Sequence, residues 1–545
     1  MEPSEIQPPA DPHLSIANQL SAWLRVETGR KLSTGILVGI GATWLVIRFC
    51  GLGTAPPGFF VDEATPALHA MCLAETGKNA VGEPWPLYSP AAGNMAGQHT
   101  LALLSLDVIW LKGFGTSRVA FRAVSAFLFL VTALGLFFLA REIASMAPHE
   151  SRAESGMRPF PWLVLLAALV SPWSFQFSRI GWDPPVGPTY MVLSLVGMVR
   201  SYRGGRWAVA WSAFTGFCAA ASMTAYAPLR AVVPLVLTSL AVLLFVLRSE
   251  WRARWGFIRS LLVAAFVAAI LLAPTLRMLS TGEINQRMNN IAIWNPSWIK
   301  EHAGSMHRPL FLVMTFLDNV VAHLQPSFLF IKGDANIRHS AHIAGHLSPV
   351  DMVALLCVLW FGLALLLRLV RGRAPFPAGQ AAGLPTYQRW LTATALCAAL
   401  GWFFGIVPAA LTWDGLPQAL RAIAAWPFVA LFTGAVLALA WSRRRWMPAV
   451  LAVVALAHTV YFLPAYFRAF DKTETYWFMR EMVDLIEKNR HETSPKPIPQ
   501  LVSQNLGLGY GYDEMLRYFL MHDGGMRCDE ATAAVRAYWK AARGE

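Results

Sequence analysis

The sequence predicts an α-helical protein that crosses a membrane many times, and three observations indicate this class. Of the 545 residues, 55% are hydrophobic and only 14% are charged, whereas soluble domains have about a quarter of their residues charged. The mean hydropathy is +0.44. Apolar runs of roughly 18 to 22 residues recur along the chain, and a helix of that length crosses about 30 Å of hydrocarbon. We therefore expect a polytopic helical bundle.

The apolar runs are predicted to form eleven membrane helices. They lie at 33–50, 118–140, 161–178, 184–200, 207–224, 230–247, 258–276, 349–368, 390–410, 419–440 and 446–463. A further apolar segment, 98–115, is short and is interrupted by Asp107 and Lys112. We expect that segment to form a helix lying along the membrane surface.

The basic residues orient these helices, because arginine and lysine collect in cytoplasmic loops. Basic clusters follow every second run: Arg141, Arg152 and Arg158; Arg200, Arg203 and Arg206; Arg248, Arg252, Arg254 and Arg259; Arg368, Arg371, Arg373 and Arg389; Arg443, Arg444 and Arg445. They share a side with Arg25, Arg30 and Lys31 only if 98–115 does not cross. We therefore predict a cytoplasmic N-terminal segment (1–32), a membrane domain (33–463) and an outer domain (464–545). The net charge of +13 then reflects orientation, and no nucleic-acid partner is expected.

Long outer loops at 51–117 and 277–348 hold the unusual polar residues. The first contains PPGFFVDEA, in which two acids stand in apolar company. A lone acid at a helix start is explained by the helix dipole, and a lone arginine at a helix end by contact with headgroups. Their joint position in long loops on one side indicates a functional surface outside. The candidate residues are Asp62, Glu63, Arg179, Asp183, Tyr226, Arg230, Arg338, His339 and Arg421.

The histidines and cysteines are the candidate metal ligands in this sequence. His339, His342 and His346 are spaced i, i+3, i+7, which on one helix would form a metal site. Gly345 and Pro349 interrupt that helix, so contact with phosphate or headgroups is favoured, and dependence on a divalent metal stays open. The six cysteines are scattered without a C-x-x-C pair or zinc spacing.

The tail after the last run predicts a small α/β domain on the outer side. TYWFMREMVDLIEKN and YDEMLRYFLMHDG are predicted helices, and IPQLVSQ between them is predicted as a strand. Such a domain would limit access to the membrane site or help to bind an acceptor. Packing without a direct role is the alternative.

Several pieces, in this order, resemble GT-C glycosyltransferases. They are PPGFFVDEA, FGTSRVAFRAVSAFL, FSRIGWD, YAPLR, GDANIRH and QALRAIAAWP. Within that superfamily the likeness is to the group of protein O-mannosyltransferases and lipid A aminoarabinose transferases, and it covers about Gly51 to Trp426. The resemblance implies a GT-C-like bundle, a polyprenyl-phosphate sugar as donor, Asp62 as the base, and a role for Asp183. WDPP stands where the lipid A branch has an acid followed by Met-Pro-Leu, which leaves the acceptor open among lipid, glycan and protein.

Inverting transfer from a lipid phosphate to a hydroxyl needs a carboxylate base and cations where phosphate charge develops. Asp62 is predicted as that base, with Glu63 and Asp183 orienting the acceptor or the sugar. Arginine binds phosphate bidentately, so the phosphate and substrate partners are predicted to be Arg179, Arg230, Arg338 and Arg421, together with Tyr226 and His339. No cofactor is implied besides the donor. The abundant Ala and Arg and the absence of a targeting peptide favour a bacterial inner membrane.

Three other functions fit parts of the sequence. A transporter or lipid flippase would need charges within the spans and a repeat between two halves, and neither is evident in the sequence. A non-catalytic membrane scaffold fits the residue inventory as well. A transferase with a diphosphate-linked donor is the enzymatic alternative.

Overall fold

The computed structural model describes residues 27–91, 98–146, 157–247, 251–282, 284, 286–371, 386–444, 446–472, 475–492, 496–506 and 512–543. Most of the predicted cytoplasmic segment, 1–26, lies outside the described residues. So do five members of the basic clusters: Arg25, Arg152, Arg248, Arg373 and Arg445.

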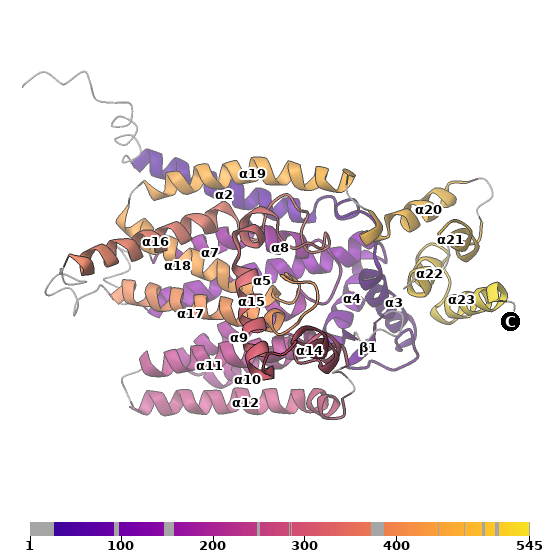
Figure 1. The fold of residues 1–545 in the computed structure, drawn as a ribbon, viewed down its shortest axis with the longest axis horizontal. Helices are drawn as coiled ribbons and strands as arrows, with labels where there is room; N and C mark the ends of the chain where they lie inside the picture. The colour runs from indigo at the N-terminus through magenta and orange to yellow at the C-terminus, as the bar shows by residue number, and fades with distance from the viewer. Residues whose placement is uncertain are drawn as a thin grey trace, which may run out of the picture.

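Long helices lie side by side and form the body of the molecule (Figure 1). In chain order they are α2 (Glu27–Phe49), α5 (Arg118–Met146), α7 (Phe160–Leu169), α9 (Val186–Arg203), α10 (Ala208–Ala225), α11 (Leu229–Leu247), α12 (Trp251–Ser280), α16 (Pro349–Val370), α17 (Thr386–Ala410), α18 (Trp426–Arg443) and α19 (Met447–Lys472). Each of the eleven predicted ranges contains helix. Among the described residues, eight helices are long and apolar enough to cross a membrane. The fold is therefore the predicted polytopic helical bundle.

The predicted helix at 161–178 is in fact two short helices. α7 ends at Leu169, and α8 (Pro172–Phe177) begins after Ser171, whose side chain accepts the N–H of Ser174. Proline disfavours helical geometry in the residue before it, so Pro172 ends α7 and starts α8. A similar difference occurs at 419–440, where the 3-10 turn η3 (Ile423–Ala425) precedes α18.

The first outer loop folds into a helix, a two-stranded sheet and a second helix. α3 (Val61–Thr76) ends at Gly77, whose φ of 72° is left-handed and suits a residue without a side chain. β1 (Tyr88–Pro90) pairs antiparallel with β2 (Gln98–Thr100), with Tyr88 opposite Thr100. α4 (Leu101–Phe114) is the helix expected at 98–115. Its 14 residues would rise only about 21 Å, which is shorter than a span.

The second outer loop also folds into short helices. These are α13 (Gln286–Ile291), α14 (Pro296–His302), α15 (Arg308–Leu324) and the π-helical turn η2 (Ser327–Ile331). The N–H of Ile293 donates to Leu411 and that of Trp413 donates to Ile291. These bonds fasten the loop to the end of α17.

The tail is helical where the structure describes it. It comprises η4 (Thr475–Phe478), α20 (Arg480–Arg490), α21 (Ile498–Leu506), α22 (Tyr512–His522) and α23 (Cys528–Arg543). The predicted strand IPQLVSQ is therefore wrong: it forms α21, whose apolar residues Ile498, Leu501 and Val502 recur with helical spacing and pack on the neighbouring helices. We call η4 and α20–α23 the cap, which lies at one end of the bundle beside α3 and α4 (Figure 1).

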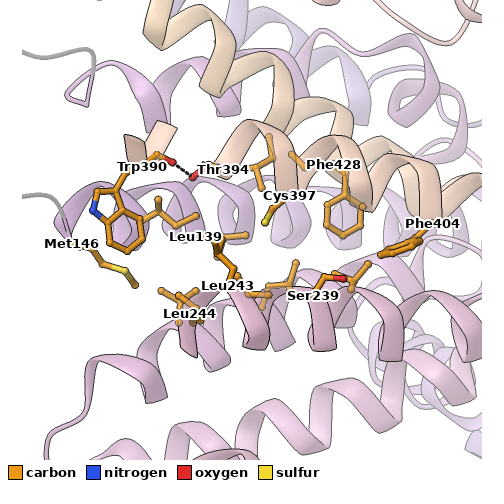
Figure 2. A pocket seen from close by; sticks show the side chains of 18 residues that line it. Leu139, Met146, Ser239, Leu243, Leu244, Trp390, Thr394, Cys397, Phe404 and Phe428 are labelled. Atoms are coloured by element: carbon orange, nitrogen blue, oxygen red, sulfur yellow. Dashed lines mark hydrogen bonds between the residues drawn. The ribbon is translucent and has the colours of Figure 1, made fainter. Parts of the chain in front are cut away.

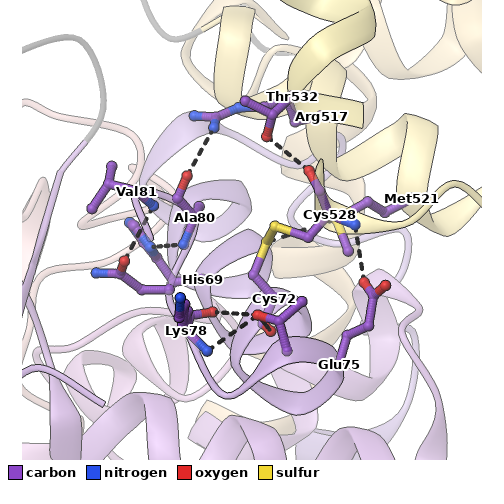
Figure 3. The surroundings of a disulfide bond; sticks show 12 residues. His69, Cys72, Glu75, Lys78, Ala80, Val81, Arg517, Met521, Cys528 and Thr532 are labelled. Atoms are coloured by element: carbon purple, nitrogen blue, oxygen red, sulfur yellow. Dashed lines mark hydrogen bonds between the residues drawn. A yellow bond between two sulfur atoms is a disulfide. The ribbon is translucent and has the colours of Figure 1, made fainter. Parts of the chain in front are cut away.

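A disulfide joins the cap to the first loop. Cys72 of α3 and Cys528 of α23 are bonded across 456 positions of sequence. Around this bond the Cys528 N–H donates to Glu75 and Arg517 donates to the carbonyl of Ala80 (Figure 3). The pairing was not predicted, although both cysteines lie outside the predicted spans on the same side.

An apolar cavity lies between α5, α9, α11, α17 and α18, and extends from the helix ends away from the cap, at Met146 and Trp390, to Phe428 near the start of α18 (Figure 2). Leu139, Leu244 and Phe404 are among its lining residues. The hydroxyls of Ser239 and Thr394 on its wall donate to carbonyls of their own helices, at 2.8 Å in both cases. The wall therefore offers hydrocarbon rather than polar groups that need partners.

Candidate active site

The two neighbouring acids of the first loop have different surroundings. Glu63 is fully buried, and its two carboxylate oxygens accept from Nε and Nη2 of Arg122, each at 2.7 Å. The Gly181 N–H donates to the same carboxylate at 2.8 Å. Arg122 also donates to the carbonyls of Leu52, Pro56 and Gly58. These contacts give Glu63 a positioning role: it holds the arginine that fixes the loop leading into α3.

Asp62 remains accessible at the start of α3. Its side chain is 47% exposed, and its Oδ2 lies 3.5 Å from Nη1 of Arg338. The Arg338 guanidinium carbon lies 5.0 Å from the ring centre of Phe60 and 5.2 Å from that of Trp477. A carboxylate that is open to solvent and borders a cation is free to engage a substrate hydroxyl.

Arg179, predicted as a phosphate partner, is instead fully buried. Its five N–H groups donate to the carbonyls of Ile47, Arg48, Cys50, Gly51 and Ala55 at 2.7–3.1 Å. The last carbonyls of a helix have no partner within that helix, and here Arg179 satisfies those at the end of α2. None of its N–H groups is left for a phosphate, so the predicted contact does not fit this geometry.

Asp183 is buried beside β2 and forms a pair with a histidine that the sequence analysis missed. Its Oδ2 lies 2.7 Å from Nδ1 of His99, and its Oδ1 accepts from the N–H of Thr100 at 3.0 Å. The buried Nε2 of His99 has no hydrogen-bond partner within the described part of the chain. Asp107, on α4, is buried near the same carboxylate. Its burial is the larger cause, and the negative charge of Asp183 the smaller, of a pKa raised well above the usual range.

Charges of both signs converge on Tyr226. Burial raises the pKa of this phenol to about 12, the nearby guanidinium groups of Arg421 and Arg287 oppose the shift, and the carboxylates of Asp183 and Asp62 add to it. The fold therefore brings these predicted residues near one hydroxyl. Arg287, on α13, belongs to the same region and was not predicted.

The remaining predicted arginines differ in their engagement: Arg230 makes long contacts, whereas Arg421 is buried and hydrogen-bonded. Arg230 lies 3.5 Å from the Tyr88 hydroxyl and is partly exposed. Arg421 donates to Thr412 and forms an ion pair of 3.0 Å with Asp414.

The three histidines at 339–346 each place a ring nitrogen within hydrogen-bond distance of an atom of Asp334. Asp334 Oδ2 lies 2.9 Å from His339 Nδ1, its carbonyl lies 2.8 Å from His342 Nε2, and its N–H donates to His346 Nε2 at 3.1 Å. Burial chiefly lowers the pKa of His346 to about 3. Within the described ranges, no group of three His, Cys, Asp or Glu side chains has the geometry of a metal site.

Sequence signals existed for two of the missed residues. Arg122 lies in FGTSRVAFRAVSAFL, a piece of the resemblance, and His99 immediately precedes the predicted surface helix. Trp477 carried no comparable signal because its neighbours in space, Phe60 and Arg338, are distant in sequence.

Comparison with known proteins finds similarity in fold alone. No family model matches the sequence, and no curated protein does. The chain is similar to the archaeal oligosaccharyltransferase AglB from Archaeoglobus fulgidus, solved in complex with an inhibitory peptide and a dolichol-phosphate, with TM-score 0.46 and 13% identity over 90% of this chain. It spans 64% of that enzyme's length, less than two thirds.

A second similar structure is ArnT from Cupriavidus metallidurans bound to undecaprenyl phosphate. The TM-score is 0.38 and the identity 17%, over 85% of this chain and 82% of that one. The roles of individual residues rest on the contacts within this chain.

Proposed function

We propose that this chain is a membrane glycosyltransferase that moves a sugar from a polyprenyl-phosphate donor to an acceptor hydroxyl on the outer face of the membrane. The observation that carries the proposal is the contrast between the two adjacent acids. Glu63 is sealed against Arg122, whereas Asp62 is 47% exposed and borders Arg338. Asp62 is thus free for chemistry, and cations lie close to it.

In the proposed reaction the Asp62 carboxylate accepts the proton of the acceptor hydroxyl. The hydroxyl oxygen then bonds to the anomeric carbon as the bond from that carbon to the phosphate oxygen breaks. The electron pair leaves with the lipid phosphate, and attack from the opposite face inverts the anomeric configuration. Arg338, Arg421 and Arg230 would stabilise the charge on the phosphate, and Asp183 would orient the sugar or acceptor through the position of β2 and α4.

Two independent features support an outward-facing site. The described arginines of the basic clusters, among them Arg141, Arg203 and Arg444, lie at the helix ends away from the cap. The Cys72–Cys528 disulfide belongs in an oxidising compartment such as the bacterial periplasm. We therefore assign the protein to a bacterial inner membrane, with the cap and the site outside. A lipid, a glycan or a protein is the acceptor.

The test is release of lipid phosphate by the purified full chain in nanodiscs, with a panel of polyprenyl-monophosphate sugars. Asp62→Asn should lower turnover by about 10²–10⁴-fold, the usual contribution of a general base. Asp484→Asn, which alters an exposed carboxylate on α20 paired with Arg480, is the matched control and should keep activity.

Other outcomes would point elsewhere. Binding of lipid-linked sugar without turnover by the wild type would favour a transporter or flippase. Equal turnover in wild type and Asp62→Asn would mean that another group is the base. Turnover only with diphosphate-linked donors would select the enzymatic alternative.

A further inference from the structure

Trp477 is an exposed aromatic residue beside a firmly packed one. Its indole is 40% exposed, whereas the next residue, Phe478, is 1% exposed. The Phe478 carbonyl accepts the N–H of Phe59 at 3.0 Å, and its ring packs edge-on against Phe60 at 6.0 Å. The backbone that carries Trp477 is therefore anchored on the loop that leads to Asp62.

The close approach of the two segments depends on a glycine. Gly58 has a φ of +67°, and a Cβ there would lie 2.1 Å from the Phe478 carbonyl oxygen. The cap is tied to the first loop region a second time by the disulfide and a third time by the ion pair of Arg118 with Glu487. These ties hold the cap against the candidate active site and fix the position of Trp477.

The indole borders Arg338, which in turn borders Asp62, and the proposed function assigns chemistry to both of these groups. The guanidinium carbon of Arg338 lies 5.0 Å from the ring centre of Phe60 and 5.2 Å from that of Trp477, and its Nη1 lies 3.5 Å from Asp62 Oδ2. A phosphate bound by Arg338 would hold its sugar next to this guanidinium, and the Trp477 indole is one of the side chains that border it. An aromatic face offers a large apolar contact area with little conformational entropy to lose.

We infer that Trp477 is a specificity-determining residue and forms the wall on which the sugar ring of the polyprenyl-phosphate donor packs. This inference rests on the proposed function. It gives the cap a direct part in donor binding: the cap supplies the sugar contact, and the bundle supplies the carboxylate and the cations. The competing explanation for an exposed tryptophan at the end of a membrane bundle is an anchor in the membrane interface, which would not distinguish one lipid phosphate from another.

The experiment compares donor kinetics of the full chain in nanodiscs for wild type, Trp477→Phe and Trp477→Ala. Trp477→Ala should raise KM for the sugar-linked donor by about 10-fold, and Trp477→Phe, which keeps an aromatic face, by less than about 3-fold. Inhibition by polyprenyl phosphate without a sugar should be unchanged in both variants. Trp446→Ala is the matched control, since Trp446 is 46% exposed and precedes α19 at the end of that helix opposite to the cap.

Two results would overturn the inference. One is an unchanged KM for every donor in Trp477→Ala. The other is an equal weakening of the sugar-linked lipid and the bare lipid phosphate, which would mean that Trp477 acts through Arg338 or the membrane. If Trp477→Ala also loses thermal stability, Trp477→Phe decides: at wild-type stability, a KM raised by less than about 3-fold supports the inference, and a KM raised as much as in Trp477→Ala contradicts it.

Failure of the proposed function gives a different pattern. If the wild type turns over no donor, equilibrium binding of sugar-linked and bare polyprenyl phosphate to the same proteins replaces the kinetics. Tighter binding of the sugar-linked lipid that is lost in Trp477→Ala would support the sugar wall without a transferase. A wild type with no preference for the sugar-linked lipid would contradict the wall.

Discussion

At the end of the bundle that carries the cap, which we call the outer end, fully buried arginines each donate to several carbonyls or carboxylates, whereas the cavity that reaches the opposite, inner end is lined by hydrocarbon. Arg122 and Arg179 are examples of the first kind. At the inner end Glu142 is also buried, with its side chain 7% exposed, but the two arginines that pair with it are 42% and 44% exposed. A buried charge is tolerated only when its partners replace its hydration. The outer loops therefore have one well-defined arrangement, which is what a site built on Asp62 needs.

The largest difference between the two ends should appear when one partner of a buried pair is removed. Glu63→Gln leaves Arg122 fully buried without its counter-charge, and we expect a loss of about 3–5 kcal/mol. Glu142→Gln at the inner end should cost about 1 kcal/mol or less, because its arginines are screened by solvent. Thermal unfolding in detergent measures both. Equal losses would contradict the contrast between the two ends.

Removal of the disulfide should have the next largest effect. Cys528→Ser or reduction should destabilise the attachment of the cap by about 2–4 kcal/mol, because the bond joins segments 456 residues apart in sequence. Faster proteolysis within α20–α23 would report it. Cys357→Ser, which alters a free cysteine on α16, is the control. Resistance of the reduced protein to the protease would mean that packing alone holds the cap.

Acidification should weaken the outer end selectively. Burial, and secondly His99, lower the pKa of His69 to about 3, against about 6.5 in an unfolded chain. Between these values only the unfolded chain takes up the proton, so stability falls by about 1.4 kcal/mol per pH unit as the pH decreases below 6.5. Melting temperatures at pH 7.5, 6 and 5 would show the decline.

The matched variant for this prediction is His69→Gln. It should make the dependence on pH less steep but not abolish it, because His346 is also buried with a lowered pKa. A slope identical to that of the wild type would show that His69 titrates normally.

The smallest effect is expected on the wall of the inner cavity. The Ser239 hydroxyl donates only to the Leu235 carbonyl of its own helix, so Ser239→Val should change stability by about 1 kcal/mol or less and leave activity intact.

At the outer end, Thr100→Val removes a hydroxyl that contacts Asp183 at 3.2 Å and should lower turnover. Similar turnover in the two variants would remove the functional distinction between the ends.

Much of the architecture could be predicted from hydropathy and charge. Long apolar runs predict helices because every backbone polar group in hydrocarbon must be satisfied internally, and each predicted range contains helix. The apolar segment 98–115 likewise contains a helix, α4, and it is too short to cross the membrane. The break between α7 and α8 was not predicted, because it depends on the backbone restriction imposed by Pro172, and hydropathy does not detect that restriction.

The sequence by itself determined the helices and the gathering of acids and arginines in the long outer loops. Only the tertiary structure decided which of these side chains are available for chemistry. The polar atoms of Glu63 and Arg179 are hydrogen-bonded to buried partners, whereas the Asp62 carboxylate remains exposed to solvent beside Arg338. The tertiary structure also decided that Trp477 reaches this site. The physical reason is that hydropathy acts along one helix, whereas hydrogen bonding and burial of a charge depend on groups supplied by segments far apart in the chain.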